Sequence, residues 1–216
     1  MQVVSTARRR GMTLIPCRAA LAGLAGGLAA LVATSSPAAE SPAWSVGGEV
    51  RVTCPMTVGG SFEAKTTALG GSVTLDAARP PAFGGELSVD LRTLDTGIDL
   101  RNHHLRDNYL EVGKGEGFER ATLSDIHLGD VDAGTFQGRT EFTGTFLLHG
   151  TKKAISGQAE ITREGSNVRV VATFTVTIAD YGIAKPQYLG VGVKSQVQVK
   201  VSLVATPVAA PAGASR

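Results

Sequence analysis

The chain has 216 residues, with 21 Lys and Arg against 19 Asp and Glu, two Cys and 43% hydrophobic residues. This length suits one domain with an appendage and is ample for a buried core, and two cysteines are too few for a disulfide scaffold. The first 38 residues contain four Arg and no acidic residue, so the rest of the chain has a net charge of −2. This balance argues against a protein that binds nucleic acid by neutralising phosphates.

The N-terminal segment is predicted to be a signal peptide at residues 1–38. Arg8–Arg10 form a cationic start, residues 19–33 form an apolar run, and small residues with a proline follow. The run is shorter than the roughly 20 residues that span a bilayer comfortably, although an uncleaved anchor is an alternative. We expect cleavage after Ala38 and a periplasmic or secreted protein. The Arg9-Arg10 pair leaves twin-arginine export open beside the general secretory route.

Most of the remaining chain alternates apolar and polar residues with a period of two, as antiparallel strands with one wet face do. In the clearest case, residues 168–178 place Val, Ala, Phe and Ile on one face and mostly Thr on the other. Residues 197–203 alternate Val and Leu with Gln, Lys and Ser. Shorter strands are predicted around residues 48–54, 61–66, 73–75, 87–91, 142–148 and 155–161.

Two architectures fit these eight or nine strands. Inward faces of Val, Leu, Ala, Gly and a few Phe could line an eight-stranded barrel around an apolar ligand, or they could pack the dry core of a sandwich. Cys54 lies on the apolar face of its strand and is predicted to be a buried small hydrophobe. Residues 206–216 are rich in Pro and Ala and are predicted to form a disordered tail.

One polar segment, residues 95–109, interrupts the strands. Arg101, Leu105 and Tyr109 have helical i, i+4 spacing, so the segment is predicted to be a loop with a short helix over residues 99–108 and with Asp99 as its N-cap. Long polar insertions between strands are often functional.

Few residues of the chain suggest chemistry. Motifs of the common hydrolases, zinc proteases, and phosphate- or calcium-binding loops are absent from the sequence. Arg101, His104 and Arg106 place two cations and a titratable ring on one short helix, where they could hold an anionic head group at a cavity mouth or pair with the aspartates of the same segment. Adjacent His side chains on a helix point about 100° apart, so no shared metal site, and no cofactor, is expected.

Several motifs, in order, resemble those of the YceI-like family. The matching segments are residues 94–97, 101–106, 109–112, 142–153, 179–183 and 191–201. Residues 101–106, R-N-H-H-L-R, are similar to the family's R-D-x-H-L, although Asn102 stands where the family usually has Asp. Residues 142–153, F-T-G-T-F-L-L-H-G-T-K-K, are similar to its G-x-L-T-L-H-G-V-T-K.

The resemblance covers about residues 44–205 and implies one all-β domain, an eight-stranded antiparallel lipocalin-like barrel. Family members bind long amphiphiles, notably polyisoprenoids, in an internal tunnel. The resemblance thus implies an exported binding protein, not an enzyme, that holds a polyisoprenoid or similar lipid and meets membranes only transiently, for lipid exchange. A homodimer is one candidate for its oligomeric state.

The residues expected to contact the ligand are Arg101, His104 and Arg106 at the head group, and Phe142, Phe146, Phe174 and Val199 on the tunnel wall. We favour an alternative role for Arg101 and His104, in which they tie the insertion to the barrel through hydrogen bonds to buried carbonyls. Two rival functions remain. One is a structural or stress-response barrel with a filled core, and the other is a lipid-modifying enzyme with His104 as general base.

Overall fold

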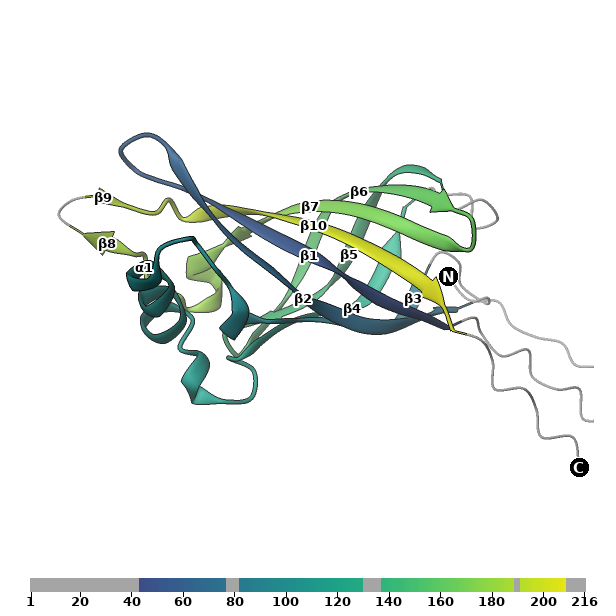
Figure 1. The fold of residues 1–216 in the computed structure, drawn as a ribbon, viewed down its shortest axis with the longest axis horizontal. Helices are drawn as coiled ribbons and strands as arrows, with labels where there is room; N and C mark the ends of the chain where they lie inside the picture. Colours follow the sequence, from purple (N-terminus) through teal and green to yellow (C-terminus); the bar gives the residue numbers. More distant parts are fainter. Residues whose placement is uncertain (1–42, 77–81, 130–136, 189–190, 209–216) are drawn as a thin grey trace, which may run out of the picture. The chain divides into compact units, whose positions relative to one another are not determined.

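A computed structural model describes residues 43–76, 82–129, 137–188 and 191–208 (Figure 1). The predicted signal peptide and its cleavage site lie outside the described residues. Of the predicted C-terminal tail only residues 206–208 are described, and Thr206 and Pro207 still belong to the last strand.

Eight antiparallel strands form a closed barrel. They are β1 (Ala43–Pro55), β2 (Ser61–Asp76), β3 (Ala82–Asp90), β4 (Arg120–Leu128), β5 (Gly138–Leu148), β6 (Thr151–Glu164), β7 (Asn167–Thr177) and β10 (Gln196–Pro207). From β1 to β7 each strand pairs with the next one along the chain, and β10 closes the barrel between β7 and β1. The closure confirms the predicted barrel and excludes the sandwich, because all eight strands belong to one continuous sheet.

The period-two pattern of the sequence explains which side chains face inward. On β7, Phe174 and Val176 are buried while Thr175 between them is exposed. On β10, Val197 and Val199 are buried while Gln198 between them is exposed. Burial of one apolar face supplies the main stabilisation of such a sheet, and the wet outer face carries the Thr, Gln and Lys residues.

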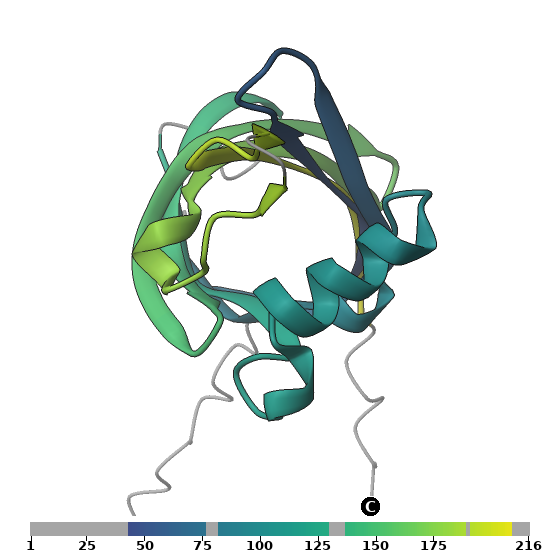
Figure 2. The same cartoon turned by 90° about the vertical axis from the view of Figure 1, so that its left-hand side faces the viewer.

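The described helices and the two short strands outside the barrel lie at one of its ends. Between β3 and β4 the chain forms η1 (Leu91–Thr93), α1 (Asp99–His103), η2 (His104–Tyr109) and η3 (Val112–Lys114). Between β7 and β10 it forms η4 (Ile178–Tyr181) and the paired two-residue strands β8 (Gln187–Tyr188) and β9 (Val191–Gly192). Figures 1 and 2 show α1, β8, β9 and the β1–β2 turn together at this end.

The predicted short helix is present, and it is continuous from α1 into the π-helical turn η2. The prediction that Asp99 is the N-cap is wrong by one residue, because the cap is Ile98 and no side chain caps the helix there. The side chain of Asn102 ties the helix to the segment before it, because its Oδ1 accepts hydrogen bonds from the Thr96 backbone N–H and hydroxyl, both at 2.7 Å. No helix among the described residues is long and apolar enough to cross a bilayer.

Candidate ligand site

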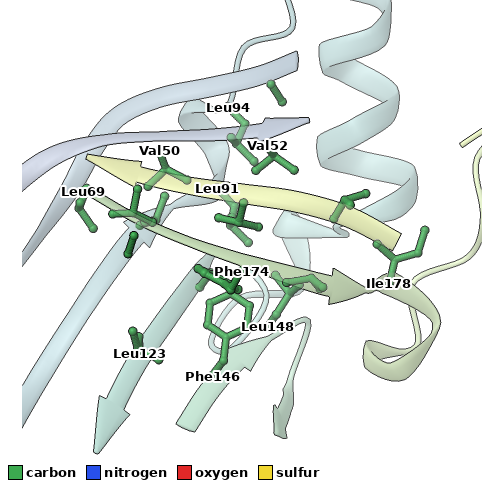
Figure 3. A pocket seen from close by; sticks show the side chains of 18 of the residues that line it. Val50, Val52, Leu69, Leu91, Leu94, Leu123, Phe146, Leu148, Phe174 and Ile178 are labelled. Atoms are coloured by element: carbon green, nitrogen blue, oxygen red, sulfur yellow. The ribbon is translucent and has the colours of Figure 1, made fainter. Parts of the chain in front are cut away.

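The barrel encloses an apolar cavity of about 240 Å³ (Figure 3). All but two of its lining side chains are hydrocarbon, the exceptions being Cys54 and Tyr109. The four residues predicted for the tunnel wall, Phe142, Phe146, Phe174 and Val199, all line it. Their contact with a ligand stays a prediction, but their inward orientation is a property of the fold.

Three aromatic rings from β5 and β7 form a cluster in the cavity wall. The Phe174 ring meets Phe142 and Phe146 edge to face, with centroids 6.0 and 5.6 Å apart, a geometry that aromatic pairs prefer. Gly157 of β6 pairs with both Phe142 and Phe174 and lies between them. A Cβ at Gly157 would lie 2.7 Å from Phe142 Cε1 and 2.8 Å from Phe174 Cβ, so glycine is required for this packing.

The cavity is closed at one end and reaches solvent at the other. Val46, Ala205 and Val168 are cross-strand neighbours on β1, β10 and β7, and all three are buried without lining the cavity. At the opposite end the lining residues Phe62 and Tyr109 are partly exposed. We call this end the mouth; it is formed by the β1–β2 turn, residues 95–109 and the described residues of 182–194.

Arg101 lies at the mouth. Its guanidinium carbon is 4.5 Å from the centroid of the Phe62 ring, which lines the cavity. Burial raises the pKa of the Cys54 thiol to about 11, and the positive charge of Arg101 partly opposes this shift, which places that charge near the cavity. Within the described part of the chain, no carboxylate pairs with Arg101. The prediction that Cys54 is a buried small hydrophobe is confirmed.

The other two residues of the predicted head-group cluster are placed differently. Arg106 donates from Nε and Nη2 to the carbonyl oxygen of the buried Leu94, at 3.2 and 2.6 Å. His104 is exposed, and its ring lies near that of His103, with centroids 6.2 Å apart. We expected Arg101 and His104 to donate hydrogen bonds to buried carbonyls. Arg106 makes such bonds instead.

Further contacts hold the insertion on the barrel. The backbones of Asp95 and Lys65 exchange two hydrogen bonds of 2.9 Å, which join the start of the insertion to β2. The buried Asn102 donates from Nδ2 to Asp95 Oδ1 at 2.7 Å. Hydrogen bonds from the Gly97 N–H and from Asn102 hold the pKa of Asp95 below its usual value.

A tie that involves His149 was not predicted from the sequence. His149 Nδ1 lies 2.9 Å from the Tyr181 carbonyl oxygen, and Nε2 lies 2.9 Å from Glu111 Oε2. Lys114 Nζ is 2.8 Å from the same carboxylate oxygen. These contacts join the end of the insertion to the β5–β6 turn and to η4. The available signal was the position of His149 in the turn motif L-H-G-T-K, which is also one of the motifs that carry the family resemblance.

The titratable residues at the mouth do not form a metal site. Among the described residues, no three His, Cys, Asp or Glu side chains lie close enough together to hold a metal ion.

Comparison with known proteins identifies the family. Residues 40–205 match the YceI-like domain. The chain belongs to the YceI-like family. None of the curated proteins is similar enough in sequence to match it.

Solved structures of YceI-like and related proteins have the same fold. BcnA of Burkholderia cenocepacia is 17% identical with a TM-score of 0.57, and the match covers 73% of this chain and 96% of BcnA. A polyisoprenoid-binding domain from Saccharophagus degradans, implicated in plant cell wall breakdown, is 17% identical with a TM-score of 0.57, over 78% of this chain and 99% of the domain. A Campylobacter jejuni YceI protein is 14% identical with a TM-score of 0.52, over 70% and 87%. At these identities the similarity shows the fold alone. Fold and family together support a barrel-shaped binding protein.

Proposed function

We propose that this YceI-like protein is an exported carrier that holds a polyisoprenoid or similar long-chain amphiphile in its barrel, for transport, storage or stress protection. The observation that carries the proposal is the enclosed cavity, which has no charged residue in its lining. A polyisoprenoid-binding domain among the structural neighbours supports the ligand class. The cationic and apolar N-terminal segment supports export to the periplasm or beyond.

The lining of the cavity suits a hydrocarbon chain rather than a compact polar molecule. Each CH₂ group that moves from water into an apolar site gains about 0.8 kcal/mol, whereas a polar group buried there without a partner loses free energy. The ligand would therefore enter with its hydrocarbon end first, and its polar head would stay at the mouth. The closed end at Val46, Val168 and Ala205 limits how deep the chain reaches.

We assign the head-group contact to Arg101. Its guanidinium is at the mouth, half-buried against Phe62, and free of a carboxylate partner among the described residues. A guanidinium binds phosphate or carboxylate with two parallel hydrogen bonds. Arg106 is already hydrogen-bonded to Leu94 and His104 is exposed, so we expect both to contribute less than Arg101 to head-group binding.

The two rival functions have less support. A filled core does not account for the open volume among Phe146, Phe174 and Val199. For an enzyme, the only titratable side chains in the lining are Cys54 and Tyr109. The raised pKa of Cys54 keeps its thiol protonated near neutral pH, in which form it is a poor nucleophile.

Filling the cavity tests the binding site. Ala172 lines the cavity, whereas Ala154 is exposed on β6, so Ala172→Phe and Ala154→Phe add the same ring inside and outside the barrel. Titration with a long-chain prenyl alcohol should show saturable binding to the wild type and to Ala154→Phe, with Kd raised at least about tenfold in Ala172→Phe. Equal affinity of the two variants would show that the lipid binds elsewhere.

A further inference from the structure

The mouth of the barrel carries exposed apolar side chains. Among the described residues, the large hydrophobic side chains that are most exposed are Val58 (68%), Leu100 (65%), Val208 (53%) and Ile98 (49%). Val58 lies in the β1–β2 turn, and Ile98 and Leu100 lie at the start of α1. Figures 1 and 2 show that these two segments stand on different sides of the same barrel end. Three of the four side chains therefore belong to segments that border the mouth.

The apolar surface of the mouth is continuous with the cavity. Phe62 follows the β1–β2 turn and lines the cavity, and Leu105 does so one helical turn beyond Leu100 and Arg101. A hydrocarbon chain that leaves the cavity would thus pass from lining residues directly to the exposed side chains. Singly scattered apolar residues on a surface need no explanation, but three of them on the two segments that border a cavity opening do.

The charges around the mouth favour an anionic partner. The β1–β2 turn, Met56–Gly60, contains no charged residue. Lys185 and Lys194, on either side of β8 and β9, are exposed, and neither has a carboxylate partner within the described ranges. Arg101 adds a third cation. Against these stand the exposed Asp99 and the exposed Asp180 of the adjacent η4, whereas Asp95 is hydrogen-bonded to Asn102 and Asp107 is paired with His103.

We propose that the mouth docks on the surface of a lipid bilayer that contains anionic lipids, with Val58, Ile98 and Leu100 inserted among the lipids. This inference rests on the proposed function, because a long-chain amphiphile is insoluble in water and has to pass between a bilayer and the cavity. Interfacial binding grows with the apolar area inserted and with attraction between basic residues and anionic lipids. Aliphatic side chains on separate projections suit a fluid surface, whereas protein interfaces concentrate Tyr, Trp and Arg at a packed centre.

Flotation with vesicles tests the docking surface. The probes are vesicles of phosphatidylcholine alone and of phosphatidylcholine with an equal amount of phosphatidylglycerol. The wild type should float with the mixed vesicles, more weakly with the neutral ones, and less at high salt. The double variant Val58→Asp/Leu100→Asp should partition at least about tenfold less. Val208→Asp is the control, because Val208 is also an exposed apolar residue but lies past the end of β10, away from the mouth, and this variant should float like the wild type.

The outcomes separate docking from ligand binding. Titration with a prenyl alcohol dispersed in detergent measures the cavity alone, and Val58→Asp/Leu100→Asp should bind it like the wild type. A wild type that binds the alcohol but floats with neither kind of vesicle would overturn docking and leave the proposed function standing. A wild type that floats with the vesicles but binds no alcohol would overturn the proposed function and leave docking standing.

Self-association is the main competing use of this surface. Sedimentation of the wild type and the double variant without lipid distinguishes the two. If the wild type is a dimer, the double variant is a monomer and both float equally, the mouth is an interface between copies. This result would overturn docking on a bilayer. A monomeric wild type that floats as described supports docking.

Discussion

Arg101 and Arg106 lie on the same helical segment and carry the same charge, but they have different contacts. Arg106 donates two hydrogen bonds to the buried carbonyl of Leu94. Arg101 instead stacks on Phe62 and has no carboxylate partner among the described residues. The first arrangement stabilises the insertion and the second leaves a cation for a ligand. Substitution of Arg106 should therefore affect mainly stability, and substitution of Arg101 mainly ligand binding.

We expect Arg106→Ala to lower the free energy of unfolding by about 1–3 kcal/mol, because it leaves a buried acceptor unpaired. Arg101→Ala should cost at most about 1 kcal/mol, the size of an exposed cation–π contact. It should instead raise Kd for a prenyl phosphate about tenfold and leave Kd for the prenyl alcohol unchanged. Urea unfolding and lipid titration of both variants provide the measurements. A loss of stability in Arg101→Ala as large as in Arg106→Ala would refute the assignment.

Glu111 lies where Lys114 and His149 meet, and these neighbours, with Lys114 contributing most, hold its pKa below the ordinary value of 4.5. Because the folded pKa is the lower one, the carboxylate stabilises the fold above pH 4.5, and this stabilisation is lost as the pH falls through the folded pKa. Both ring nitrogens of His149 face acceptors, the Tyr181 carbonyl and this carboxylate.

We therefore expect Glu111→Gln to destabilise the protein near neutral pH and to approach wild-type stability in acid. The comparison is made by urea unfolding at a series of pH values from 7 down to the acid limit of folding. Glu116→Gln is the control, because Glu116 is exposed and has no ion pair among the described residues. A difference between Glu111→Gln and the wild type that stays constant with pH would contradict the role of the carboxylate.

At the scale of elements, a strand has to present the same face along its length, and β5 shows this most clearly. Phe142, Phe146 and Leu148 face the cavity, whereas Thr143 is exposed. The Gly157 position on β6 opens space for the rings of Phe142 and Phe174. The aromatic cluster therefore depends on the pairing register of β5, β6 and β7 together.

Phe146→Asp tests this orientation. A carboxylate in the apolar wall would have no partner, and we expect the variant to lose more than about 3 kcal/mol of stability. Thr143→Asp, on the outer face of the same strand, should change stability by about 0.5 kcal/mol or less. Thermal or urea unfolding of both variants gives the comparison. Similar stability of the two would mean that the inner and outer faces are assigned the wrong way round.

The elements of the fold were largely predictable, because each strand shows its inner face in its own alternation and the short insertion shows helical spacing. Closure into a barrel was not, and only the family resemblance favoured it. The tie from Arg106 to Leu94 ends on a backbone carbonyl, which has no sequence signature. The contact of His149 with Glu111 and Tyr181 joins segments far apart in the chain. The open cavity likewise depends on which small residue falls opposite which ring, as at Gly157.

At the scale of the whole barrel, the molecule has one packed end and one open end. Buried residues such as Val46 and Val168 fill the first, and the β1–β2 turn, the insertion and the described residues of 182–194 frame the second. The ties through Arg106, Asn102 and His149 hold the mouth in place around the cavity. An apolar interior whose partly apolar opening is fixed by hydrogen bonds is the arrangement expected of a protein that takes up a hydrocarbon chain from one end.

If the proposed function is right, this cavity holds a long-chain lipid in the cell. The most direct test is mass spectrometry of an organic extract from natively purified protein, with Ala172→Phe purified in parallel as the variant whose cavity is filled. We predict a prenyl or similar long-chain lipid in the wild-type extract, in near-stoichiometric amount, and a strong depletion of that lipid from the Ala172→Phe extract. A wild-type extract that contains no more lipid than the Ala172→Phe extract would contradict the account.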